Sequence, residues 1–358
     1  MVYPLAYGPM DKYIVHFTWK CKNKINTVLS GLKARLGRTN KFSFCCNGSK
    51  PRLLHQKTNN ENNENMLSHY LAGLIEGDGS IIVPRTHRNE KGKLLYPQVK
   101  ITFVDKDTPL ANKLKEILKA GTIEYPRNKK YVNYRVQDVD TLQKIAVLLN
   151  GKMRTPKLEA LHRLIDWLNA RNSRLHLKNP QIPKLGLDNS NLGDNPWLSG
   201  FIESDGNFYC SFVLNSEGIA KAVKHFMRIS QKATYGKNAE LSLENNSNFH
   251  IMEKIREFLD VKNVSKIKRI RENYVELSYE VRTSKKASCE ILMNYLTKYP
   301  LFSSKFQDYL SWCEIHKIRM SKEYKTIEGT KKLISLKNGM NTLRTQFNWD
   351  SLNKFYNI

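Results

Sequence analysis

The sequence predicts an α+β protein built from two similar halves within one chain of 358 residues. Three observations lead to this prediction. A short helical motif occurs twice, each copy precedes segments that alternate between apolar and polar residues, and amphipathic stretches follow those segments. A period of two residues is typical of half-buried strands, and a period of 3.6 is typical of surface helices. The expected order in each half is αββαββα, and we expect the final helical part of each half to consist of two helices.

The two copies of the motif open the two halves. They read MLSHYLAGLIEGDGS at 66–80 and NPWLSGFIESDGN at 195–207. Gly73 and Gly77 are four residues apart, as are Gly200 and Ser204, so each pair lies on one helix face. Small residues at this spacing let two helix backbones approach closely. We therefore expect these four residues at an interface where the two helices pack around a pseudo-twofold axis.

Strands and further helices follow each motif. The alternating segments are 99–104, 207–212 and 275–281. The amphipathic segments are 105–119, 138–150, 155–169, 248–260, 285–296 and 304–317. Alternation predicts sheets with one buried face and one polar face.

The repeat divides the chain into five parts. They are a basic extension with a polar linker at 1–64, the first half at 65–171, a second linker at 172–194, the second half at 195–341 and a tail at 342–358. The extension has no acidic residue between Asp11 and Glu61. It is open to three interpretations: a nucleic-acid-binding arm, an organelle-targeting segment, or a leader without a function of its own.

The charge of the chain is strongly positive. Lys and Arg number 59 and Asp and Glu number 33, which gives a net charge of +26. Such a surface attracts polyanions, of which nucleic acid is the commonest and an acidic lipid surface is the alternative. Because no run of about 18 apolar residues occurs, no membrane span is expected.

The six cysteines point to no metal site. They are Cys21, Cys45, Cys46, Cys210, Cys289 and Cys313. They form no CxxC pair, and no two histidines stand at zinc-ligand spacing, so a zinc site is not expected. Scattered thiols favour a reducing compartment.

Each motif helix is expected to end in an acid. Asp78 and Asp205 are both followed by glycine, a residue that permits a helix exit. Close packing of the helices brings the two carboxylates together at the negative ends of two helix dipoles, where they repel each other. A cation offsets this repulsion, and oxygen ligands favour Mg²⁺. A metal so placed activates water and stabilises the leaving oxygen of a phosphodiester.

The segments LAGLIEGDG (71–79) and LSGFIESDG (198–206) closely resemble the two motifs of LAGLIDADG homing endonucleases. The first departs from that pattern at two positions and the second at four. The resemblance implies the single-chain, two-motif subtype, whose β-sheets form a DNA-binding saddle. It makes Asp78 and Asp205 the metal-binding acids, and it adds the backbone carbonyls of Gly77 and Ser204 as metal ligands.

The resemblance extends over about 65–341 and implies further roles. A basic residue near the scissile phosphate maps to Lys157 in RTPK and to Lys305 in SSK, where it would stabilise developing negative charge. We expect Glu76 and Glu203, at the sixth motif position, to balance local charge or contact a structural partner rather than to catalyse.

Base recognition is expected from the polar faces of the strands, because a sheet fits the major groove. The candidates for DNA contact are Arg85, Gln98, Lys100, Asn133, Arg135, Gln137, Asn207, Tyr209, Ser211, Arg228, Ser230, Glu276 and Ser278.

The leading functional prediction is a Mg²⁺-dependent, site-specific endonuclease that acts as a monomer on double-stranded DNA and promotes intron homing. One alternative is an RNA maturase that assists splicing of its host intron, alone or in addition to cleavage. A weaker alternative is a DNA-binding repressor. The resemblance and the Asn- and Lys-rich composition place the protein in the mitochondrion, as do many two-motif members of this family.

Overall fold

The computed structural model describes residues 52–86, 88–236, 247–270, 272 and 274–356, with side chains from Glu61 onward. Most of the predicted basic extension lies outside the described residues, together with its three cysteines.

The first half follows the predicted order of elements. It contains α2 (Arg52–Asp78), β1 (Gly79–Ile82), β2 (Gln98–Val104), the 3-10 turn η1 (Asp105–Asp107), α3 (Thr108–Leu118), β3 (Thr122–Glu124), β4 (Tyr131–Val136), α4 (Val139–Leu149) and α5 (Leu158–Arg174). Local signals set several of these bounds. Asp138, for example, accepts the backbone N–H of Thr141 at 2.9 Å and so caps the start of α4.

The second half repeats this order and adds a helix. It contains α6 (Trp197–Asp205), β5 (Gly206–Leu214), β6 (Ala220–Lys232), α7 (Phe249–Phe258), β7 (Ser265–Ile270), β8 (Val275–Thr283), α8 (Lys286–Lys298), α9 (Lys305–Ser321) and α10 (Ile327–Asn338). Short 3-10 turns lie at Leu192–Asp194, Glu323–Lys325, Asn341–Leu343 and Asp350–Lys354. The helix α10, which starts where Thr326 caps the N–H of Gly329, was not predicted.

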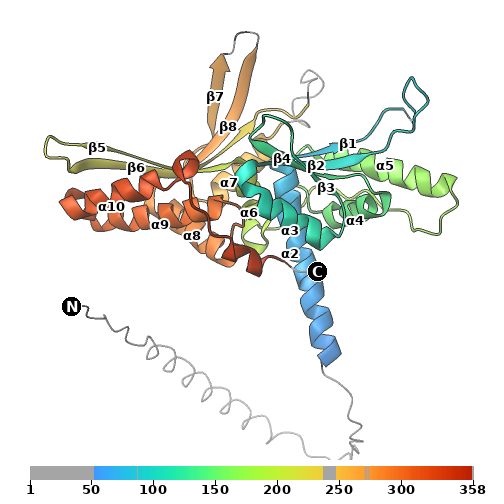
Figure 1. Ribbon diagram of the computed structural model, residues 1–358, viewed down its shortest axis with the longest axis horizontal. Coiled ribbons are helices and arrows are strands. Elements are labelled where there is room, and N and C mark those ends of the chain that lie inside the picture. Colours follow the sequence, from blue (N-terminus) through green and yellow to red (C-terminus); the bar gives the residue numbers. More distant parts are fainter. Residues whose placement is uncertain (1–51, 87, 237–246, 271, 273, 357–358) are drawn as a thin grey trace, which may run out of the picture. The chain divides into compact units, whose positions relative to one another are not determined.

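The two sheets have the same topology. Their strand orders are β1-β2-β4-β3 and β5-β6-β8-β7, with antiparallel pairing throughout. The equivalent pairs Gly79↔Ile101 and Gly206↔Ile229 set the same register behind both motifs. In Figure 1, helices α8 to α10 lie below the β5–β6 sheet. The predicted α+β fold of two pseudo-symmetric halves is confirmed.

The alternation of the strands is also confirmed. Val99, Ile101 and Phe103 of β2 are buried, as are Phe208 and Cys210 of β5. These side chains belong to one hydrophobic core that runs through both halves. The opposite faces of both sheets are therefore free of the helices that build the core.

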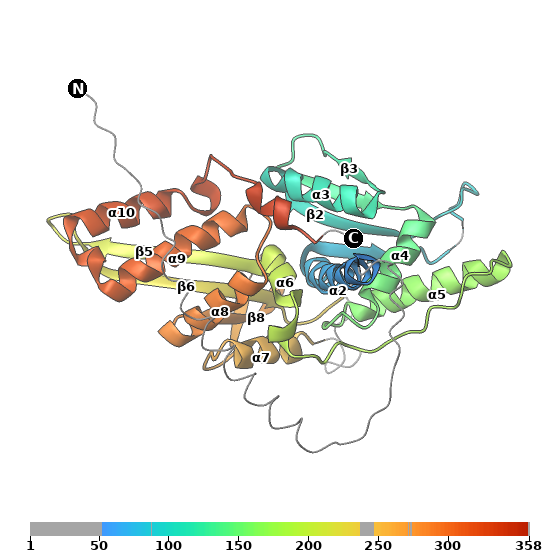
Figure 2. The same ribbon diagram turned by 90° about the horizontal axis from the view of Figure 1, so that it is seen from below.

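The helices α2 and α6 lie side by side between the two sheets (Figures 1 and 2). A Cβ added at Gly73 would lie 2.8 Å from the amide nitrogen of Phe201 and closer still to the carbonyl oxygen of Trp197. At Gly200, a Cβ would lie 2.8 Å from the amide nitrogen of Leu74 and closer still to the carbonyl oxygen of Tyr70. Since any side chain would collide with the opposing backbone, glycine is required at both positions. We call this contact the motif interface.

Two ends of the described chain differ from the expectation. The sequence suggested a polar linker up to residue 64, but α2 begins at Arg52 and continues through that run. In the tail, Phe355 is buried, with its ring 5.4 Å from that of Tyr70 and 4.7 Å from that of Phe302. The tail thus covers the motif interface. Among the described residues, no helix is both long enough and apolar enough to span a bilayer.

Replacing Gly200 by alanine is expected to lower the free energy of unfolding by about 3 kcal/mol, because the methyl group meets backbone atoms that cannot rotate away. Urea denaturation of the full chain measures this change. Gly186→Ala is the matched control, since a Cβ there meets nothing within 4 Å. Equal effects of the two substitutions would contradict the requirement for glycine at the motif interface.

Candidate active site at the paired helix ends

The two motif aspartates meet where α2 and α6 end. Asp78 is exposed and Asp205 is half-buried. A Cβ on Gly77 would lie 2.7 Å from Oδ2 of Asp205 and closer still to the side chain of Ser204, so the last turns of the two helices are in contact. The structure therefore brings both predicted acids to one place.

The electrostatics of this place favour a cation. Desolvation, followed by the charge of Asp78, raises the pKa of Asp205 to about 7. Desolvation also raises the pKa of Asp78, while Lys305 and Lys157 act to lower it. Two neighbouring carboxylates, one of which opposes the ionisation of the other, are a suitable donor set for a hard divalent ion.

Lys157 reaches the end of α2. It stands just before α5, is 9% exposed, and directs its ammonium group at four carbonyls. Its Nζ donates to the oxygens of Glu76 at 2.7 Å, Gly79 at 2.8 Å, Ile75 at 2.9 Å and Gly77 at 3.3 Å. Three of these carbonyls belong to the last turn of α2, where carbonyls lack the amide partners of a helix interior, and the fourth belongs to Gly79 at the start of β1.

Lys305 makes the equivalent contact with α6. As the first residue of α9, it donates from Nζ to the carbonyl oxygens of Glu203 at 2.6 Å, Ser204 at 2.7 Å and Ile202 at 3.2 Å. Desolvation lowers the pKa of both lysines, while the nearby carboxylates raise it. Each lysine thus caps a motif helix and places positive charge beside the aspartates.

The lysines occupy the carbonyls that the sequence predicted as metal ligands. The carbonyl of Ser204 accepts Lys305, and that of Gly77 accepts Lys157 at the longer distance of 3.3 Å. A carbonyl oxygen has two lone pairs, so a metal at either position would share the oxygen with an ammonium group. The carboxylates of Asp78 and Asp205 are consequently the stronger candidates for metal ligands.

The glutamates at the sixth motif position, Glu76 and Glu203, brace the site; we call them the motif glutamates. Oε1 of Glu76 accepts the backbone N–H groups of Arg154 at 2.8 Å and Thr155 at 2.5 Å, just before α5. Glu203 accepts the N–H groups of Phe302 and Ser303 before α9 in the same way. Each motif glutamate therefore fixes the segment that carries the lysine of its own half.

The motif glutamates also link the two halves. Oε2 of Glu76 accepts Nε1–H of Trp197 at 2.6 Å, and Oε1 of Glu203 accepts the hydroxyl of Tyr70 at 3.3 Å. Trp197 and Tyr70 each immediately precede the motif of their half. The pair of bonds is thus pseudo-symmetric across the motif interface. Both glutamates are buried, and desolvation raises the pKa of Glu76 to about 7.

Two further residues were missed because their partners are distant in sequence. Asp107 precedes α3 without capping it, and its Oδ1 accepts the N–H of Ser304 at 2.7 Å in the other half. Gln231 donates its Nε2–H to Asp205. By strand register the first-half equivalent of Gln231 is Phe103, so the surroundings of the two aspartates differ.

The register places the first-half DNA-contact candidates on the face of the sheet opposite the core. Lys100 pairs with Arg135, and Gln98 and Asn133 follow two residues away on the same face. Arg85 and Gln137 are exposed just beyond β1 and β4. Asn133 is only 8% exposed, so its availability to a ligand is limited.

The second-half candidates share the equivalent face. Asn207 pairs with Arg228, and Tyr209, Ser211, Ser230, Ser278 and Glu276 follow at alternate positions of the paired strands. Ser278 is buried at 3% exposure. The centre of the face is crossed by Glu280, which pairs with both Arg228 and Arg282. The sequence did not predict these two ion pairs, which neutralise part of the basic charge on this face of the sheet.

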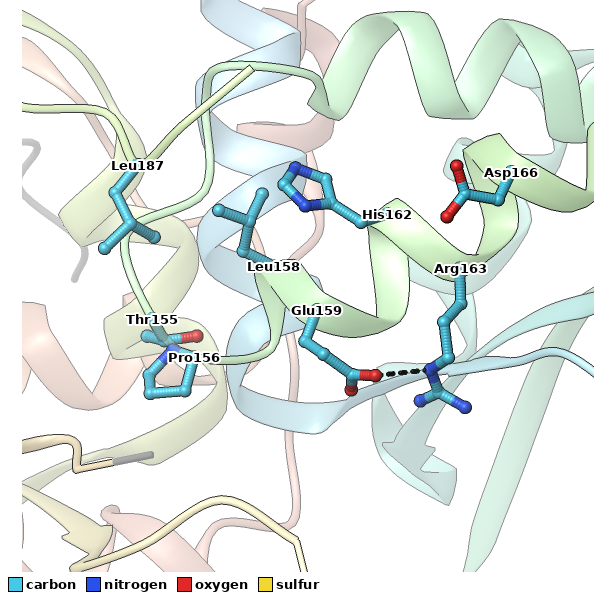
Figure 3. Close-up of a pocket in the computed structure, with 8 residues that line it drawn as sticks. All are labelled: Thr155, Pro156, Leu158, Glu159, His162, Arg163, Asp166 and Leu187. Atoms are coloured by element: carbon cyan, nitrogen blue, oxygen red, sulfur yellow. Dashed lines mark ion pairs between the residues drawn. The ribbon is translucent and has the colours of Figure 1, made fainter. Parts of the chain in front are cut away.

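A surface pocket at the start of α5 does not contain the two aspartates. It is lined by Thr155, Pro156, Leu158, Glu159, His162, Arg163, Asp166 and Leu187 (Figure 3). Glu159 and Arg163 form an ion pair there, with Oε1 and Nε 2.8 Å apart. Since this pair lies one helical turn apart on an exposed face, the pocket is a surface feature of α5.

Glu76→Gln is expected to lower the free energy of unfolding by about 1–3 kcal/mol, because an amide donor then faces the N–H donors around it. Trp197→Phe removes one of those donors, so the double variant should lose about 1 kcal/mol less than the sum of the single variants. Urea denaturation of all four proteins gives this coupling. Glu159→Gln is the surface control. Additive effects would show that the Glu76–Trp197 bond contributes nothing to stability.

Asp205→Asn is expected to stabilise the metal-free protein at high pH. Because its folded pKa of about 7 lies above the ordinary value of 3.8, Asp205 lowers stability as the pH rises from about 4 to 7. The substitution removes this cost and should raise the free energy of unfolding by about 1–3 kcal/mol at pH 8, allowing for partial solvent screening. The gain should vanish near pH 4. Denaturation in chelator across this range measures it, and a gain independent of pH would contradict the assignment.

Comparison with known proteins matches this geometry to a family. The family model described as LAGLIDADG endonuclease matches residues 71–168 and 198–316, one region in each half. The intron-encoded DNA endonuclease aI3 of Saccharomyces cerevisiae is 29% identical over 89% of this chain and 80% of its own length. A probable intron-encoded endonuclease 4 of Neurospora crassa is 28% identical over 78% of this chain, but this chain spans only 45% of that protein.

Solved structures share the fold. The homing endonuclease I-GzeII, in complex with its DNA target, has a TM-score of 0.58 at 17% identity, covering 78% of this chain and 99% of that one. The endonuclease I-LtrWI, bound to target DNA, has a TM-score of 0.54 at 20% identity and covers 79% and 100%. With both halves matched by the family model and both motif helices packed as described, the chain belongs to the LAGLIDADG endonuclease family.

Proposed function

We propose that this protein is a site-specific endonuclease that cuts both strands of a long DNA target and promotes homing of its intron. One observation carries the proposal: Asp78 and Asp205 meet at the ends of α2 and α6, between two sheets whose polar faces are free of the core helices. The intron-encoded nucleases to which the chain is similar support the same activity.

The proposed cofactor is Mg²⁺, held by the carboxylates of Asp78 and Asp205. The donor set fits, because the charge of Asp78 adds to desolvation in raising the pKa of Asp205, and both carboxylates supply hard oxygen ligands. When bound, the ion supplies activation of water and stabilisation of the leaving oxygen. Gly77 and Ser204 would contribute carbonyl oxygens that they share with the lysines.

The protein's own residues orient and balance this site. Lys157 and Lys305 hold the two helix ends in place, offset the paired carboxylates, and supply positive charge that would stabilise developing negative charge. Gln231 fixes the carboxylate of Asp205. The motif glutamates position the segments that carry the lysines, which makes them positioning residues.

The DNA is proposed to lie along the polar faces of the two sheets. Lys100, Arg135 and Gln98 would contact it in the first half, and Asn207, Ser211 and Ser230 in the second. Side chains on such faces reach base edges in the major groove, while lysines and arginines in the flanking loops contact phosphates. The proposed location is the mitochondrion, which the Asn- and Lys-rich composition supports.

Asp78→Asn and Asp205→Asn are each expected to abolish double-strand cleavage while leaving DNA affinity within about threefold, because each removes a proposed metal ligand and no proposed DNA contact. The substrate is a plasmid that carries the two sequences flanking this reading frame's intron joined without it. Cleavage is measured with Mg²⁺ and with Ca²⁺, and affinity by gel shift in Ca²⁺.

Asp166→Asn is the matched control, because Asp166 pairs with Lys184 at 3.0 Å on the surface of α5. It should cut as the unaltered protein does. Double-strand cleavage by either active-site variant would overturn the proposed mechanism, and no cleavage by the unaltered protein would overturn the proposed function on that substrate.

A second function in RNA splicing is supported by one comparison. The intron-encoded RNA maturase bI4 of Saccharomyces cerevisiae is 24% identical over 56% of this chain, which spans 29% of that protein. A splicing assay with the cognate intron tests this separately. A maturase activity would survive Asp78→Asn, since RNA binding does not need the paired carboxylates.

A further inference from the structure

A second cluster of metal-binding side chains lies away from the aspartates. His225 of β6, Cys289 of α8 and His316 of α9 each offer one ligand atom, and these atoms all lie within 4.8 Å of one another. The three residues are 2%, 0% and 4% exposed. They are 64 and 27 residues apart along the chain, which is why sequence spacing gave no sign of them.

Two imidazole nitrogens in this cluster have no partner among the described residues. They are Nδ1 of His225 and Nδ1 of His316, both buried. Buried polar atoms are nearly always hydrogen-bonded, so two such atoms in one cluster require an explanation. A ligand that accepts lone pairs from nitrogen and sulfur would give both Nδ1 atoms a partner.

The other nitrogen of His225 is already oriented for this purpose. Its Nε2 lies 3.2 Å from the carbonyl oxygen of Trp312 and can only donate to it. That bond places the proton on Nε2 and leaves the lone pair on Nδ1. A histidine that binds metal typically donates its second ring N–H to a carbonyl or carboxylate in this manner.

The surroundings keep the imidazoles in the form that binds metal. Burial lowers the pKa of His225 to about 3, with a further contribution from His316, and burial lowers the pKa of His316 as well. Both rings are therefore neutral near pH 7. Burial raises the pKa of the Cys289 thiol to about 11, so the thiol keeps its proton until a cation binds.

We propose that His225, Cys289 and His316 form a binding site for Zn²⁺, separate from the site at the aspartates. Two nitrogens and one thiolate suit this borderline-soft ion, whereas Mg²⁺ prefers oxygen. Binding forms two Zn–N bonds and one Zn–S bond, and the thiol proton leaves to solvent. A water molecule completes the four ligands.

The geometry requires only small movements. Tetrahedral zinc holds neighbouring nitrogen and sulfur ligands about 3.5 Å apart, so the three atoms need to close from within 4.8 Å by about 1 Å. This closure would come from rotation of the side chains and would move the Cys289 thiol away from the carbonyl oxygen of Thr283, which it now faces at 3.8 Å. Zinc would then join strand β6 to the two helices behind it, and α9 is the helix that carries Lys305 at its start.

Cobalt substitution tests the site without relying on cleavage. The full chain is purified in chelator and titrated with Co²⁺ in excess Mg²⁺, which competes at carboxylate sites. One equivalent of Co²⁺ should give a thiolate-to-cobalt charge-transfer band with the visible bands of tetrahedral cobalt, and Zn²⁺ should abolish both. Absence of the charge-transfer band from the unaltered protein would overturn the proposal.

Matched variants identify the ligands. Cys289→Ser should lose the charge-transfer band, whereas Cys313→Ser should keep it, because Cys313 is a buried thiol one turn before His316 but outside the cluster. Should Cys289→Ser fail to fold, His316→Gln retains the thiol and should weaken Co²⁺ binding at least tenfold. Retention of the band in Cys289→Ser, or unchanged affinity in His316→Gln, would equally overturn the site.

Discussion

The contact between the backbones of α2 and α6 is the constraint on which the rest of this structure depends. Gly73 and Gly200 each face the carbonyl and amide groups of the opposing helix, so the axes approach as closely as helices can. That approach brings two carboxylates together at two negative helix ends, an arrangement that is unfavourable by itself. Lys157 and Lys305 offset this repulsion, because each donates hydrogen bonds to free carbonyls at the end of one of the two helices.

The motif glutamates make this arrangement rigid in two directions. Each accepts backbone N–H groups just ahead of the helix that follows, α5 for Glu76 and α9 for Glu203, and each also accepts a ring or hydroxyl donor from the other half. A buried carboxylate is costly unless its oxygens are hydrogen-bonded. Both oxygens of Glu76 accept donors, whereas in Glu203 the donors converge on Oε1, and Oε2 has no partner among the described residues. The symmetry is incomplete, however, because Gln231 holds Asp205 while Phe103 occupies the matching position, and Asp107 links the halves only once.

Much of the fold and part of the site were predictable from the sequence. The strands could be predicted, because alternation such as that of Val99, Ile101 and Phe103 directly reflects a sheet with one buried face. The position of the aspartates followed from the spacing of small residues. The contacts of Glu76 with Trp197 and of Asp107 with Ser304 were not, since they join residues 121 and 197 positions apart. The helical run before residue 65 could not be predicted either. Its polar residues have only a weak helix preference, and they extend a helix that the motif already stabilises.

The lysine caps have a consequence for how a gene of this kind would decay. A mutation that removes Asp78 or Asp205 relieves repulsion, so a chain that loses its acids still folds. A mutation that removes Lys157 leaves three carbonyls of the last turn of α2 and the carbonyl of Gly79 without this donor, which lowers the stability of the folded chain. In copies released from selection for cutting but still selected for another role of the folded protein, the aspartates should therefore drift first while the lysines persist.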